Sequence, residues 1–102
     1  MGISFNKPIK LNEKAALGRV DIITTDDSFI ISWIQIKNDN CNLVLRKVSQ
    51  TGKLSNIYFV DDISCDRSGG NPKMEIFGTK LFIAWTIAET GIETHWLDLD
   101  QF

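Results

Sequence analysis

The sequence predicts an all-β fold, and two kinds of observation support this expectation. β-Branched and aromatic residues recur in short runs, separated by turn-forming residues roughly every 8 to 12 positions. In addition, residues 18–35 match residues 70–87 without a gap at a constant offset of 52 (70 − 18 for two glycines, 85 − 33 for two tryptophans). A fixed period of this length indicates two copies of one supersecondary unit, neither of which can bury its apolar surface alone.

The two copies agree most closely at positions suited to a turn or to a core. Identical residues stand at Gly18/Gly70, Ile31/Ile83 and Trp33/Trp85. Apolar character is kept at Ile22/Met74, Phe29/Leu81 and Ile30/Phe82. We expect both tryptophans to pack in the core between adjacent units, with a platform for stacking sugars as the alternative.

The first unit is preceded by an alternating segment. Residues 3–11 alternate between apolar and polar side chains, and Pro8 within them indicates an edge strand. Residues 12–17 are interpreted as a connector, because so short a segment cannot sustain a helix. The strands of the first unit are then predicted at 18–25, 28–36, 41–49 and 53–60. The strand at 28–36 is apolar on both faces, so we expect it to be covered on both sides.

The second unit follows a long loop at residues 61–71. Its strands are predicted at 72–77, 80–86 and 92–99. Gly52 and Gly78 mark tight turns, where glycine supplies positive φ. The acidic pairs Asp26-Asp27 and Asp61-Asp62 are also expected in turns, where their side chains hydrogen-bond to nearby backbone.

The order of the strands favours a β-propeller. Lettered A to D within each unit, the strands read D, ABCD, ABC: residues 18–60 form one four-stranded antiparallel blade and residues 70–99 most of a second. Residues 3–11 are then the outer strand that completes the last blade, which is how a propeller closes its ring. The chain is thus interpreted as a single two-blade unit. An eight-stranded β-sandwich is the alternative, because eight strands in 102 residues also suit two packed sheets.

Two blades do not make a ring, since propellers contain about four to eight. We therefore expect either a homo-oligomer, for instance a trimer that makes six blades, or completion by the remainder of a longer propeller. Isolated blades would expose apolar faces and unpaired strand edges, which favours association. Self-association or insolubility is the expectation for the chain alone.

Composition excludes several classes of partner. The formal net charge is −2 and the pI is about 5.2, with basic residues dispersed, so a nucleic-acid interface is not expected. No apolar run approaches the roughly 20 residues that span a bilayer, and the beginning of the chain does not resemble a signal peptide. The compartment stays open at this point.

The cysteines do not indicate a metal site. Cys41 and Cys65 are 24 residues apart (65 − 41), with no CxxC pattern and no histidine at ligand spacing. We expect two free, half-buried thiols, with a disulfide as the alternative, because two cysteines make a weak framework. No cofactor is expected either.

The stretches GRVDIITTDDSFIISWIQ, LVLRKVSQTGKLS and RSGGNPKMEIFGTKLFIAWT carry a resemblance to a known family. Within them, the matching residues are Gly18-Arg19-Val20-Asp21, Ser32-Trp33, Arg46-Lys47-Val48-Ser49 with Gly52, Arg67-Ser68-Gly69, Pro72-Lys73 and Ala84-Trp85-Thr86. On these residues the chain resembles sialidase-like, six-bladed β-propeller proteins. The resemblance implies blades of that type, and glycans or acidic ligands as the class of partner.

The candidate ligand-binding residues follow from this resemblance. Arg19 and Arg67 flank the inner strands of the two units, and a guanidinium can hold a carboxylate with two hydrogen bonds. Their alternative partners are Asp21 and Asp66, in contacts between blades. Trp96 is the best candidate for an exposed aromatic that stacks on a ligand, with packing between blades as the alternative.

No catalytic residues are assigned. The Asp-box octapeptide of sialidases, S-x-D-x-G-x-T-W, and their arginine-bearing F/Y-R-I-P motif are both absent, and His95 has no legible triad partners. The leading hypothesis is therefore a non-catalytic propeller segment that acts as a scaffold or as a module binding glycans or acidic ligands. A part of an exo-sialidase or related glycoside hydrolase is the enzymatic alternative, and a sandwich used only for protein contacts is the third.

Overall fold

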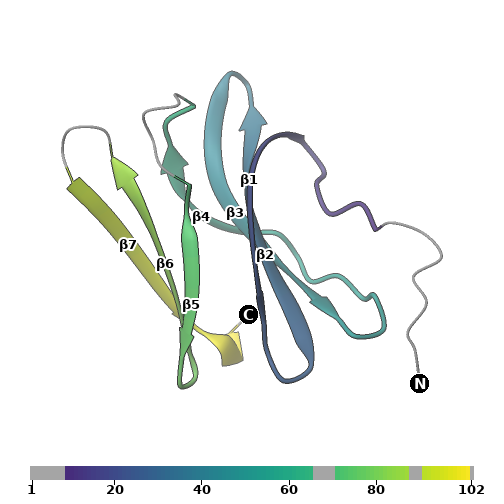
Figure 1. The fold of residues 1–102 in the computed structure, drawn as a ribbon. Helices are drawn as coiled ribbons and strands as arrows, with labels where there is room; N and C mark the ends of the chain where they lie inside the picture. Colours follow the sequence, from purple (N-terminus) through teal and green to yellow (C-terminus); the bar gives the residue numbers. More distant parts are fainter. Residues whose placement is uncertain (1–8, 66–70, 88–90, 102) are drawn as a thin grey trace.

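The structure, a computed structural model, describes residues 9–65, 71–87 and 91–101. These residues form two antiparallel β-sheets, one of four strands and one of three, as Figure 1 shows. We call them sheet 1 (β1–β4) and sheet 2 (β5–β7). Each sheet is built from consecutive strands and neither closes on itself, so the all-β prediction is confirmed.

Sheet 1 is a meander of β1 (Ala15–Thr24), β2 (Ser28–Lys37), β3 (Asn40–Ser49) and β4 (Tyr58–Ile63), in that order. Two boundaries differ from the sequence prediction. β1 begins at Ala15, within the predicted connector, because Ala15 and Ala16 pair with the end of β2. The fourth strand lies later than 53–60, and Leu54 makes only an isolated bridge to Val48.

The shift of β4 corrects the interpretation of one acidic pair. Asp61 and Asp62 lie in β4 and pair with Leu43 and Asn42 of β3, instead of lying in a turn. Asp27 does lie in a turn, where its Oδ1 accepts hydrogen bonds from Thr25 Oγ1 and Ser28 Oγ.

Sheet 2 repeats the first three strands of sheet 1 with β5 (Lys73–Phe77), β6 (Lys80–Ile87) and β7 (Gly91–Asp98). A short 3₁₀ helix, η1 (Leu99–Gln101), follows β7 and replaces the predicted last residue of that strand. Gly52 and Gly78 adopt positive φ (87° and 63°), as predicted for their turns.

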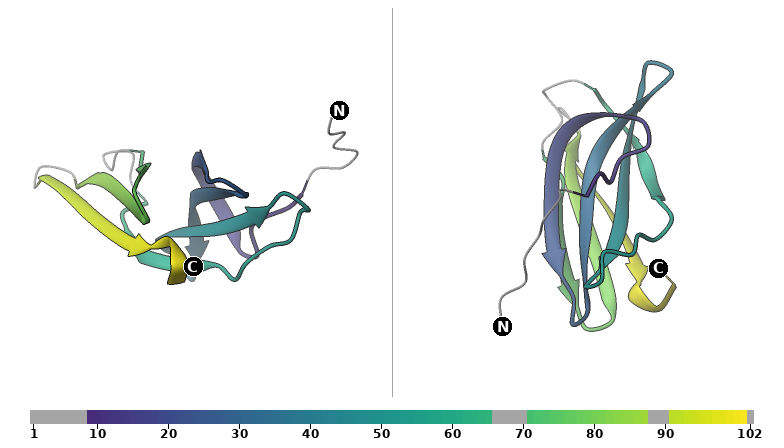
Figure 2. Two further views of the ribbon diagram at one scale, coloured as in Figure 1. Left: turned by 90° about the horizontal axis from the view of Figure 1, so that it is seen from below. Right: turned by 90° about the vertical axis from the view of Figure 1, so that its right-hand side faces the viewer.

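The two sheets lie as separate layers with the core between them (Figure 2). Alternate residues of β2, Ile30 and Ile34, are fully buried, and so are Leu81 and Ile83 of β6. Trp85 is buried in this core as expected, whereas Trp33 is buried on the opposite face of sheet 1, beside residues 9–12. The core cluster contains Ile30, Ile34, Cys41, Leu43, Leu45, Val60, Met74, Leu81, Ile83, Trp85 and Leu97.

A disulfide joins Cys41 at the beginning of β3 to Cys65 just beyond β4, with the Cα atoms 5.4 Å apart. The expectation of two free thiols is therefore wrong. Spacing alone could not show the bond, because it depends on the register of β3 and β4. Cys41 pairs with Ile63, which places Cys65 beside it.

Residues 9–12 lie against sheet 1, on the side that faces away from sheet 2 (Figure 1). The carbonyl oxygen of Leu11 accepts a hydrogen bond of 2.8 Å from Arg46 Nη1 on β3. Residues 3–8 of the predicted outer strand fall outside the described residues. In the described part of this chain, no fourth strand pairs with β7. The same part contains no helix of the length and apolar character needed to cross a bilayer.

The disulfide is expected to stabilise the fold. In the chain-entropy model, a cross-link over this separation is worth about 3 kcal/mol. Reduction with dithiothreitol should lower the urea midpoint of unfolding by the corresponding amount. The double variant C41A/C65A should show no response to dithiothreitol, and an unchanged midpoint of the wild-type protein on reduction would contradict the bond.

Candidate functional site

Arg19 lies at a β-bulge in β1. The pairing of β1 with β2 shifts on both sides of Gly18, and Gly18 and Arg19 both have positive φ (102° and 55°). A non-glycine residue in this region is uncommon, and bulges re-aim a side chain. The Nη1 atom of Arg19 is buried, so its guanidinium is at least partly withdrawn from solvent.

Asp21 serves as a link between the two sheets. Its Oδ2 accepts a hydrogen bond of 2.8 Å from the backbone nitrogen of Met74, at the start of β5. Met74 is buried in the core. This hydrogen bond joins the two sheets and occupies one oxygen of the carboxylate, but its donor is a backbone amide and not one of the arginines expected from the sequence as partners of Asp21.

Trp96 is half-exposed on the outer face of sheet 2, the face turned away from sheet 1. Lys80 Nζ lies 4.2 Å from the centre of its ring and 3.0 Å from Asp98 Oδ1. Phe82 packs beside it, with ring centroids 6.4 Å apart. One part of the indole is therefore already covered by a cation, which leaves a reduced surface for a ligand.

Arg67 and Asp66 lie outside the described residues. The described candidates do not converge: Arg19 and Asp21 belong to β1, whereas Trp96 lies on β7 of the other sheet. His95, adjacent to Trp96, is partly buried, and its Nε2 lies 3.4 Å from Tyr58 Oη. It therefore has a structural partner across the two sheets.

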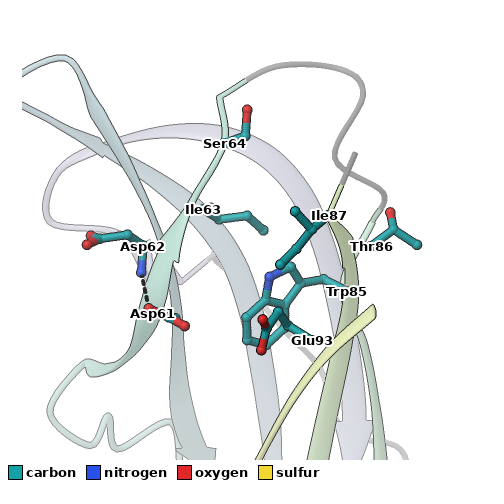
Figure 3. A pocket seen from close by; sticks show the side chains of 8 residues that line it. All are labelled: Asp61, Asp62, Ile63, Ser64, Trp85, Thr86, Ile87 and Glu93. Carbon is teal, nitrogen blue, oxygen red and sulfur yellow. Dashed lines mark hydrogen bonds between the residues drawn. The ribbon is translucent and has the colours of Figure 1, made fainter. Parts of the chain in front are cut away.

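A cleft of about 390 Å³ opens between the sheets where β4 and β6 end and β7 begins. Figure 3 shows Ile63 and Ile87 directed toward each other above the indole of Trp85, with Asp61 on the β4 side and Glu93 beside the ring. We call this the inter-sheet cleft. Its remaining lining residues are Asp62, Ser64 and Thr86.

The chemistry of the inter-sheet cleft disfavours acidic ligands. Its described lining contains three carboxylates and no lysine, arginine or histidine. Trp85 is only 4% exposed, so it offers little ring surface for stacking. The described residues also include no group of three or more His, Cys, Asp or Glu side chains suited to hold a metal ion.

A second cavity, of about 470 Å³, lies on the outer face of sheet 1 at the β2–β3 hairpin. Amide side chains dominate its polar lining, and we call it the amide groove. Phe59 of β4 is 52% exposed at its edge and supplies a free aromatic surface. The groove is lined by Gln35, Lys37, Asn38, Asn40, Asn42, Val44, Ile57, Phe59 and Asp62.

Hydrogen bonds across three strands fix the floor of the amide groove. Gln35 Nε2 donates to Asn42 Oδ1 at 3.4 Å, and Asn42 Nδ2 donates to Asp62 Oδ1 at 2.8 Å. Asn42 is buried, so its amide is held in one orientation by partners on both sides. Gln35 and Asp62, at the two ends of this row, each keep polar atoms for a further partner, because an amide or carboxylate makes more than one hydrogen bond.

Sequence reasoning missed the amide groove, although a signal was present. Gln35 lies in the predicted strand 28–36 and Asn42 in the predicted strand 41–49, and the polar residues Lys37 and Asn40 stand between these two strands. Directly paired positions across the hairpin are Gln35 with Asn42 and Lys37 with Asn40. Because the fourth strand was predicted at 53–60 instead of Tyr58–Ile63, the sequence did not show that Phe59 and Asp62 also line the amide groove.

No protein-family model, curated protein or solved structure matches the chain.

The role of Asp21 can be tested through stability. The substitution Asp21→Ala leaves the Met74 amide without its acceptor and should lower the free energy of unfolding by about 1–3 kcal/mol. Asp21→Asn keeps an acceptor and should cost less. Urea unfolding measures both, with Asp26→Ala in the exposed β1–β2 turn as the control. Equal stability of Asp21→Ala and Asp26→Ala would show that the link does not matter.

Proposed function

We propose that the chain is a non-catalytic segment of a sialidase-like β-propeller that acts as a scaffold and binds a glycan in the amide groove. Two features support the blade interpretation. Each sheet is a meander of consecutive strands, which is the connectivity of a propeller blade. The two units that repeat in sequence also fold alike, as β1–β3 and β5–β7.

The observation that carries glycan binding is the pre-arranged row of Gln35, Asn42 and Asp62 beside the exposed ring of Phe59. Sugars present hydroxyl groups that both donate and accept hydrogen bonds, together with apolar C–H faces. Amide and carboxylate side chains meet the first requirement, and an aromatic face meets the second. Because the row is hydrogen-bonded before binding, little ordering cost remains.

Lys37 gives the groove a selectivity for acidic glycans. It is the one cation in the described lining, and its ammonium can pair with the carboxylate of an acidic sugar. The disulfide suits the same setting, since disulfides persist in oxidising compartments, where glycans are displayed.

The enzymatic alternative, a part of an exo-sialidase, draws no support from the described candidates. Asp21 is engaged with the Met74 amide, and Arg19 does not line the inter-sheet cleft or the amide groove. The sandwich alternative accounts for two packed sheets, but not for the sequence repeat that coincides with them.

Titration calorimetry with a sialylated trisaccharide and its neutral parent disaccharide tests the proposal. The wild-type chain should bind both, and the sialylated sugar more tightly. Phe59→Ala should weaken binding of both sugars by about tenfold, or about 1.4 kcal/mol. Lys37→Gln should remove the preference for the sialylated sugar and leave binding of the neutral one unchanged.

Phe77→Ala is the matched control, because Phe77 is also exposed but lies on sheet 2. Its affinities should equal those of the wild-type chain. Absence of binding of either sugar at millimolar concentration would overturn the ligand part of the proposal, and equal losses in Phe59→Ala and Phe77→Ala would move the site away from the groove.

A further inference from the structure

Each sheet has an inner face turned to the other sheet and an outer face turned away. The repeat relates these faces in a definite way. Positions 52 apart are equivalent, so the outer face of sheet 1 corresponds to the inner face of sheet 2. Likewise, the outer face of sheet 2 corresponds to the inner face of sheet 1. We call the outer face of sheet 1 the front and the outer face of sheet 2 the back.

The front carries apolar residues whose counterparts are buried. Val20 is 65% exposed, whereas Pro72, its equivalent (72 − 20 = 52), is fully buried. Ile22 is 58% exposed, whereas its equivalent Met74 is 7% exposed. The counterpart of the front is the inner face of sheet 2, which packs against sheet 1. The front has the same apolar character, but no sheet of the described residues covers it.

The back shows the same discrepancy. Phe82 is 39% exposed, whereas its equivalent Ile30 is fully buried. Leu43 pairs with Ile34 and Ile92 pairs with Thr86, so Leu43 and Ile92 hold the same place in the two sheets. Leu43 is fully buried, whereas Ile92 is 72% exposed.

Residues 9–12 add an independent equivalence. They line a cavity on the front together with Trp33, and residues 61–64 line the inter-sheet cleft together with Trp85. Both sets are offset by 52 (61 − 9 and 85 − 33). Residues 9–12 thus take the same position over sheet 1 that residues 61–64 take over sheet 2.

From these equivalences we infer that the front of one copy of this chain packs against the back of a second copy, repeating between molecules the contact that joins the two sheets within one. The inference rests on the propeller part of the proposed function and not on its ligand part. The contact is head-to-tail, so it generates a closed ring or an open filament. Three copies give six sheets, which is within the range that closes a propeller.

A second copy is the partner that fits, because front and back reproduce the two faces that already pack against one another within the chain. No other partner has this complementarity by construction. In such a contact the exposed Ile92 of one copy would be covered as Leu43 is covered within the chain.

The test uses one charged substitution on each face, Ile22→Arg on the front and Ile92→Glu on the back, in sedimentation equilibrium. The wild-type chain should form species larger than a dimer, with 34.5 kDa for three copies of 11.5 kDa. Each variant alone should sediment as a monomer. An equimolar mixture should give a dimer of 23 kDa (twice 11.5 kDa), because one variant keeps its back and the other its front.

Asp26→Arg, in a turn and on neither face, should retain the wild-type mass, and circular dichroism should show all variants folded. A monomeric wild-type chain would overturn the inference. So would loss of association in only one of the two variants, which indicates a two-fold contact, or a mixture that stays monomeric. Glycan binding is read separately by calorimetry, so association and ligand binding can each fail alone.

Discussion

The packing of sheet 1 against sheet 2 is the constraint on which the rest of the structure depends. Neither sheet is large enough to bury its own apolar residues, and a small sheet with one uncovered face is marginal in water. Ile30 and Ile34 of β2 become fully buried only because sheet 2 lies over them. The same stacking brings Asp21 to the Met74 amide and Tyr58 to His95. The inter-sheet cleft is a consequence of this packing and not an independent feature.

The register of sheet 1 then determines what the outer surface can do. The pairing of β3 with β4 shifts between Leu43 and Val44, which sets Phe59 and Asp62 on the same face as Asn42. The same register brings Cys65 to Cys41. A slip by one residue would turn every one of these side chains to the other face, so the disulfide secures the strand pairing on which the amide groove depends.

Sequence reasoning reached the features that depend on short-range pattern. The offset of 52 residues identified the two units and the burial of Trp33 and Trp85, because equivalent positions take the same place in the strands of each unit. It failed where one residue's partner lies far along the chain. Cys41 with Cys65, and Asn42 with Asp62, meet through strand pairing that β4 sets, and the segment before β4 lacks the alternation that would fix its start. The sequence placed the candidates Arg19 and Asp21 correctly in a strand of the first unit. It did not show that Asp21 links the two sheets through the Met74 amide.

The amide groove and the front share one face of sheet 1, so ligand binding and association are not independent in the proposed assembly. Sheet 1 walls the inter-sheet cleft and leaves Trp85 only 4% exposed. A neighbouring copy on the front would form a wall beside the amide groove, because the groove opens on that same face of sheet 1. A wall excludes water, which strengthens hydrogen bonds to the row of Gln35, Asn42 and Asp62. By linkage, a glycan that binds the walled groove more tightly stabilises the contact between copies by the same factor. The two parts of the proposal can therefore be measured separately, and linkage requires that each changes the equilibrium constant of the other by the same factor.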